Sequence, residues 1–195
     1  GLVKAEHLLP AEPFYCINSD NIWIDAGRCS LLAMADAWDS ATMDCILLLV
    51  PQALAHNHRG KGDFFRSDDG RPVRRGVHDS APFIHTGIQV VSHRLLRDPP
   101  PGPFSTNIFW DRAIGEGRLS SVVLEGEWFD IGTPEAKRGG SPSTLVQKRR
   151  SCWGFTVSTV AARTTAETTV KTGLACHTAA ITLRYDAMNF ACSSD

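Results

Sequence analysis

The feature that most constrains the fold is an uninterrupted apolar run within residues 44–50, where Asp44 is followed by CILLLV. A strand that is apolar at every position, instead of at alternate positions, is typical of a sheet covered on both faces. The run is also far too short to cross a bilayer, which takes about 20 residues as a helix. It therefore predicts a layered α/β fold.

Strand-like and helix-like segments alternate around this run, from Gly1 to about Ala136. We expect strands at residues 14–18, 44–50, 83–91, 120–124 and 128–130, and helices at residues 30–38, 93–96 and 107–115. Residues 62–66 and 73–77 are expected to pair as a hairpin, because SDDG at residues 67–70 carries strong turn signals. The proline-rich residues 99–103 predict a loop. The alternation favours a mainly parallel sheet flanked by helices.

The sequence changes character after Ala136. Residues 137–195 are rich in Thr, Ser, Ala and Arg and show no sustained helical or strand periodicity, although residues 157–160 and 179–183 could form brief strands. We therefore expect an irregular tail that is poorly ordered or read out of the natural frame. A small appended module is the alternative.

Two short apolar segments are each broken by a carboxylate. Residues 13–20 read PFYCINSD and close on Asp20, and residues 127–134 read EWFDIGTP, with Asp130 before a Gly-Thr-Pro turn. Carboxylates at strand ends lie where α/β folds bind ligands. Two of them can hold one Mg²⁺ together with nucleotide phosphates. The structural alternative is that both aspartates only stabilise turns.

Several segments, in this order, resemble the sugar-1-phosphate nucleotidyltransferase family of the uridylyl- and guanylyltransferase type. They are GLVKA at residues 1–5, NSD at 18–20, GKGDF at 60–64, HTGIQV at 85–90, FS at 104–105 with WD at 110–111, and WFDIGT at 128–133. The resemblance implies a partial Rossmann-like, GT-A-like nucleotidyltransferase fold in residues 1–136, with a mixed sheet flanked by helices. It also implies an enzyme that transfers a nucleotidyl group from UTP or GTP to a sugar 1-phosphate, releasing pyrophosphate, in cell-wall recycling or surface-glycan supply.

The resemblance also assigns roles to residues. It implies that Asp20 and Asp130 are catalytic and hold Mg²⁺. It implies substrate binding by six further residues: Asn18, Gly62, Asp63, Thr86, Gly87 and Asn107. From the residues alone, turn formation, a hairpin start and strand packing compete with these roles. Trp110 is expected in the core, and His56 and His58 in a solvated cationic loop, because no third metal ligand is in view.

One family feature has no counterpart in this sequence. Relatives carry a glycine-rich loop of the type Leu-Ala-Ala-Gly-x-Gly-x-Arg-Met, whose backbone N–H groups wrap the triphosphate. We therefore expect the sequence to begin inside the domain. Two other functions stay open: a remnant that binds a phosphosugar or a partner without turnover, and a metal-dependent glycosyltransferase. The latter normally shows Asp-x-Asp, whereas residues 18–20 offer one carboxylate.

Composition restricts the partners. The net charge of −1 predicts no electrostatic attraction to nucleic acid or to an anionic membrane surface. The six cysteines include no Cys-x-x-Cys pair, so we expect reduced structural thiols. Together with the lack of a charged leader before an apolar segment, this indicates a cytoplasmic protein.

Overall fold

The computed structural model describes residues 2–11, 13–132 and 178–181. Its helical segments are η1 (Leu2–Leu8), α1 (Ser30–Ala37), η2 (Gln52–Leu54), η3 (His93–Leu96) and α2 (Asn107–Gly115), where η denotes a 3₁₀ helix. Its strands are β1 (Phe14–Asn18), β2 (Asn21–Asp25), β3 (Cys45–Pro51), β4 (Ala55–His56), β5 (Phe64–Arg66), β6 (Pro72–Arg74), β7 (Phe83–Val91), β8 (Leu119–Val123), β9 (Gly126–Asp130) and β10 (Thr178–Ile181). Of the predicted strands in the tail, residues 157–160 lie outside the described residues, as does the predicted domain boundary at residue 136.

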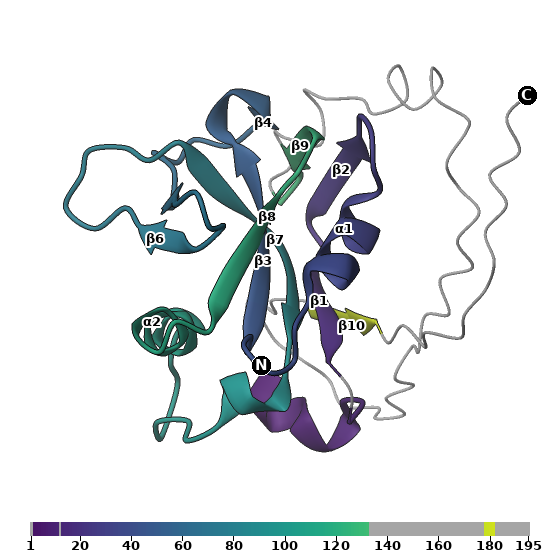
Figure 1. The fold of residues 1–195 in the computed structure, drawn as a ribbon, viewed down its shortest axis with the longest axis vertical. Helices are drawn as coiled ribbons and strands as arrows, with labels where there is room; N and C mark the ends of the chain where they lie inside the picture. The colour runs from purple at the N-terminus through teal and green to yellow at the C-terminus, as the bar shows by residue number, and fades with distance from the viewer. Residues whose placement is uncertain (1, 12, 133–177, 182–195) are drawn as a thin grey trace, which may run out of the picture.

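The described strands form two sheets. The larger has the order β10-β1-β7-β3-β8, with the hairpin β5–β6 attached to β7, and the smaller has the order β2-β9-β4. Figure 1 shows the hairpin β5–β6 projecting to one side of the layered body and β10 lying along β1. The smaller sheet brings β2 and β9, which are distant in the sequence, into antiparallel register.

Strand β3 is covered on both faces, as its unbroken apolar sequence predicted. Cys45, Leu47 and Leu49 pack in one core cluster with Phe109 and Trp110 of α2. The alternate residues Ile46, Leu48 and Val50 pack in a second cluster with Met34 of α1. Helices α1 and α2 therefore lie on opposite faces of the larger sheet, as Figure 1 shows. Burying each of these side chains stabilises the fold by about 2 kcal/mol.

The prediction of a mainly parallel sheet was wrong, whereas the mixed sheet implied by the family resemblance is confirmed. Strand β3 pairs in parallel with β8 but antiparallel with β7, and β1 also pairs antiparallel with β7. Alternation of strands and helices misled because β7 follows the β5–β6 hairpin and not a crossover helix. The pattern also gave no signal for β2, whose five residues are all half-buried.

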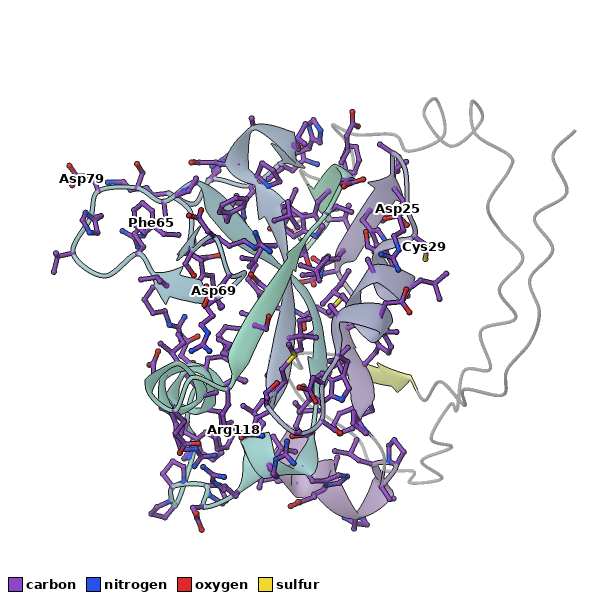
Figure 2. All side chains as sticks on the ribbon, viewed as in Figure 1. Asp25, Cys29, Phe65, Asp69, Asp79 and Arg118 are labelled. Atoms are coloured by element: carbon purple, nitrogen blue, oxygen red, sulfur yellow. The ribbon has the colours of Figure 1, made fainter. Side chains whose placement is uncertain are left out.

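Other predictions are confirmed closely. Strand β7 and helix α2 have the predicted bounds, and α1 ends one residue before the predicted Trp38. The hairpin forms with shorter strands than predicted. Asp25, labelled in Figure 2, ends β2 and accepts hydrogen bonds from the backbone N–H and the hydroxyl of Ser30, which fixes the start of α1.

A buried carboxylate joins the loop before β3 to the segments that follow β7 and precede β8 at the same end of the sheet. Asp44 is 3 % exposed and accepts hydrogen bonds from Nε of Arg94 and Nε of Arg118, each at 2.8 Å. Figure 2 labels Arg118 beside η3, the element that carries Arg94. Burial opposes ionisation, but the two guanidinium groups outweigh it and hold the pKa of Asp44 below its usual value.

Among the described residues, no helix has the length and apolar character required to cross a membrane.

Candidate functional site

A pocket lies where β1 ends, β7 bulges and the β2–β9 pair begins. Its lining is formed by Asn18, Asp20, Asn21, His58, His85, Thr86, Gly87, Trp128 and Asp130. Five of the eight predicted site residues are in this lining: Asn18, Asp20, Thr86, Gly87 and Asp130. Residues predicted from distant segments are therefore brought to one place by the fold.

The two predicted metal ligands converge on Gly132. A Cβ atom at this glycine would lie 3.1 Å from Oδ2 of Asp20 and 3.2 Å from Oδ1 of Asp130. The backbone N–H of Ile131 donates to the carbonyl oxygen of Asp20 at 2.9 Å, and the N–H of Gly132 donates to Oδ1 of Asp130 at 2.9 Å. The Asx turn weighed as the structural alternative for Asp130 is therefore present, and it also aims the carboxylate.

A bulge in β7 forms a second wall. Leu47 of β3 pairs with Gln89 and Leu49 with His85, so one residue of β3 faces three residues of β7. Gly87 sits in the bulge with φ +80°, a conformation that glycine adopts without strain. Thr86 fastens the bulge, because its buried hydroxyl donates to Leu48 O at 2.9 Å and accepts from Ile88 N. The hydroxyl of Thr86 is therefore paired within the protein, whereas Gly87, which has no side chain, lines the pocket with its backbone.

Trp128 and His58 complete the wall beside Asp130. The indole Nε1 of Trp128 donates to the backbone oxygen of Thr86 at 3.0 Å, which ties β9 to the bulge. His58 packs edge-on against Trp128, and its Nδ1 lies 3.9 Å from Oδ2 of Asp130. The expectation of a solvated histidine loop was wrong for His58, whose side chain is 23 % exposed and lines the pocket. The burial of His58 comes from its tertiary contact with β9, which the local sequence does not reveal.

Three predicted substrate-binding residues lie outside the pocket lining, and their roles stay predictions. Gly62 has φ +82°, and a Cβ atom there would lie 1.9 Å from Ala81 O, so close backbone packing requires this glycine. Asp63 accepts a hydrogen bond from the backbone N–H of His85 at 3.0 Å. Asn107 begins α2 and is exposed. Trp110 is buried as predicted, and its Nε1 donates to Gln89.

Besides His58, the sequence reasoning missed Asn21 and His85 as pocket residues. Asn21 pairs with Asp130 in the β2–β9 register. His85 packs edge-on against Trp110 with 4.7 Å between ring centroids, and burial lowers its pKa to about 4. A polar residue directly after the NSD motif, and another directly before Thr86, were the available signals.

The donor set suits Mg²⁺ bound jointly with phosphates. No three His, Cys, Asp or Glu side chains within residues 2–11, 13–132 and 178–181 gather as a metal cage. Two carboxylates that converge on one glycine match the way Mg²⁺ is usually held, by one or two carboxylates plus substrate phosphate oxygens and water.

Sequence comparison finds a relative for much of the chain. No family model matches it. The N-acetylmuramate alpha-1-phosphate uridylyltransferase of Caulobacter vibrioides is 34 % identical over 137 residues, which cover 70 % of this chain and 57 % of that protein. The chain therefore spans somewhat more than half the length of this relative.

Structure comparison finds the same fold in solved enzymes. The inositol-1-phosphate CTP transferase of T. maritima superposes with a TM-score of 0.56 at 15 % identity, over 75 % of this chain and 59 % of that one. A UDP-glucose pyrophosphorylase complexed with UDP-glucose gives a TM-score of 0.56 at 18 % identity, over 76 % and 61 %. At these identities the likeness shows the fold alone. The chain is therefore similar in sequence, over the matched residues, to an N-acetylmuramate alpha-1-phosphate uridylyltransferase, and it shares the fold of these solved enzymes.

Proposed function

We propose that the pocket serves the transfer of a nucleotidyl group from a nucleoside triphosphate to a sugar 1-phosphate. A phosphate oxygen of the sugar 1-phosphate attacks the α-phosphorus in line, the bond between the α-phosphorus and its bridging oxygen breaks, and pyrophosphate leaves. The attacking oxygen is already anionic at neutral pH, so the reaction needs positioning and charge neutralisation more than a protein nucleophile. The convergence of Asp20 and Asp130 on Gly132 is the observation that carries this proposal.

Asp20 and Asp130 would hold Mg²⁺, which when bound supplies neutralisation of phosphate charge. The Asx turn to Gly132 orients the carboxylate of Asp130 before any ligand arrives. Asn18 lines the same wall, and a Cβ atom at Gly87 would lie 2.8 Å from its Nδ2, so the bare glycine leaves the amide accessible. His58 lies on the Asp130 side of the pocket, within reach of a phosphate held there.

The printed name of the Caulobacter relative supports particular substrates. We propose N-acetylmuramate 1-phosphate as the acceptor and UTP, over GTP, as the donor. An activity of this kind belongs to cell-wall recycling, and its substrates are cytoplasmic metabolites, so we propose a cytoplasmic location.

The direct test is ³¹P NMR of the chain incubated with Mg²⁺, N-acetylmuramate 1-phosphate and either UTP or GTP. The proposal expects a UDP-sugar and pyrophosphate with UTP, and no product from the Asp20→Asn variant. Equal product from Asp20→Asn would overturn the assigned role of this carboxylate.

A second candidate is phosphosugar binding without turnover in the same pocket. It predicts Mg²⁺-dependent binding of the sugar 1-phosphate in calorimetry, with no pyrophosphate in the NMR experiment. The two measurements together separate the two candidates.

A further inference from the structure

Two polar atoms of the pocket have no hydrogen-bond partner in the described part of the chain. They are Nδ2 of Asn21 and Nε2 of His85, and both are buried. Both residues belong to the pocket lining. A buried polar group without a partner costs about 1–3 kcal/mol, so such groups usually pair with a ligand, an ion or an ordered water. The other two such atoms in the described residues, Nε1 of Trp38 and Nε2 of His56, lie outside the pocket lining. The occurrence of the Asn21 and His85 nitrogens in one pocket points to a ligand that contacts both.

The unpartnered nitrogen of His85 can serve as a hydrogen-bond acceptor. Burial lowers the pKa of the ring to about 4, so the ring is neutral at pH 7 and only one of its two nitrogens carries a proton. In the tautomer with the proton on Nδ1, Nε2 is the nitrogen without a proton, and it accepts a hydrogen bond from a ligand. A phosphate dianion has no proton to donate to it, whereas a sugar hydroxyl or amide does.

Asn21 contributes the complementary donor. It is the first residue of β2 and lies opposite Asp130. A Cβ atom at Gly87 would lie 2.3 Å from Nδ2 of Asn21, so the amide packs directly on the bare glycine of the bulge. The terminal torsions of Asn and His side chains have broad minima, so either side chain can rotate to present its nitrogen to a ligand.

We propose that Asn21 and His85 recognise the sugar part of the substrate. Nδ2 of Asn21 donates a hydrogen bond to the sugar, and Nε2 of His85 accepts one from a hydroxyl or amide group. This inference rests on the proposed function. It divides the pocket chemically: the carboxylates of Asp20 and Asp130 face the metal and phosphate groups, and the neutral pair faces the uncharged sugar. Neither residue forms or breaks a bond, so both are positioning and specificity residues.

The test combines variants with altered ligands. The probes are N-acetylmuramate 1-phosphate, the analogues that each lack one of its hydroxyls, the analogue that lacks its N-acetyl group, and inorganic phosphate, each titrated calorimetrically with Mg²⁺. His85→Phe keeps an aromatic ring against Trp110 and removes both nitrogens. His78→Phe is the matched control, because His78 is exposed and outside the pocket lining.

We expect the native chain to lose about 10- to 100-fold in affinity for one analogue, because a buried acceptor is then left unpaired. His85→Phe should bind the intact sugar 1-phosphate about as weakly as the native chain binds that analogue, and it should lose no further affinity for the analogue. Its affinity for inorganic phosphate should equal that of the native chain. Asn21→Leu should show the same pattern for an analogue that lacks a hydrogen-bond acceptor. A merely structural role would weaken all probes equally.

Two outcomes overturn the inference, and they are distinguishable. If the native chain binds sugar 1-phosphates and both variants keep its analogue profile, the inference fails alone. If the native chain binds neither phosphate nor sugar 1-phosphate with Mg²⁺, the proposed function fails and the inference fails with it. The analogue series on the native chain needs no variant, so a folding defect of His85→Phe leaves the inference falsifiable.

Discussion

Asp20 and Asp130 lie far apart in the sequence, yet their carboxylates flank the same atom position: a Cβ at Gly132 would be 3.1 Å from one and 3.2 Å from the other. The β2–β9 pairing produces this meeting, because it places Asn21 opposite Asp130 and is extended by the hydrogen bond from Ile131 N to Asp20 O. The smaller sheet is therefore the element that assembles the candidate metal site.

The position of Gly132 makes a precise prediction. Gly132→Ala places a methyl group against both carboxylates, and each must retreat by a few tenths of an ångström. We expect Mg²⁺-dependent binding of sugar 1-phosphate to weaken about tenfold in calorimetry, with the melting temperature little changed. Gly115→Ala is the matched control, since a Cβ atom there meets nothing within 4 Å. Equal affinity of Gly132→Ala and the native chain would contradict the described geometry.

The ring of His85 predicts a pH dependence of stability. Burial lowers its pKa from 6.5 to about 4 in the folded chain, with Asp63 opposing the shift and Arg74 adding to it. Between these two values the unfolded chain binds a proton that the folded chain does not, so stability falls as the pH falls from 6.5 to about 4.

His85→Phe should abolish this part of the acid sensitivity. Urea unfolding at pH 7.5 and pH 4.5 is expected to show the native chain losing about 2 kcal/mol more than the variant. Parallel losses in the two proteins would mean that His85 is protonated equally in the folded and unfolded states.

The Asp44 cluster predicts a stability effect with no effect on the pocket. Asp44→Asn leaves Arg94 and Arg118 facing a neutral amide, and the two arginine side chains are 46 % and 24 % exposed. Because water solvates part of the two positive charges, we expect the free energy of unfolding to fall by about 2 kcal/mol, as measured with urea. Asp36→Asn, in the exposed pair with Arg28, is the control and should cost less than about 0.5 kcal/mol. A similar loss in both variants would show that burial of Asp44 adds nothing.

The elements that the sequence predicted well are those whose signal is local. Strand β3 is apolar at every position, and α2 and β7 have the predicted bounds because turn residues and prolines delimit them. Strand β2 and the pairing directions could not be predicted, since a short half-buried strand shows no periodicity and direction depends on distant partners.

The candidate site divides in the same way. Asp20, Asp130 and Gly87 were predicted because they interrupt apolar strands and match family motifs, and all three line the pocket. Asn21, His58 and His85 were missed as pocket residues because their roles come from tertiary contacts: with Gly87 for Asn21, and with Trp128 and Trp110 for the two histidines. Gly62 matched a family motif, but its positive φ and contact with Ala81 follow from backbone packing that the motif does not reveal.

The central claim, a joint metal and phosphate site at Asp20 and Asp130, is tested most directly by calorimetric titration of N-acetylmuramate 1-phosphate with and without Mg²⁺. The native chain and Asp130→Asn are compared, because an amide oxygen can still accept from the N–H of Gly132 and so keep the turn. The account predicts Mg²⁺-dependent binding in the native chain, at least about tenfold weaker in Asp130→Asn, at an unchanged melting temperature. Binding that is independent of Mg²⁺, or equal in the two proteins, would contradict it.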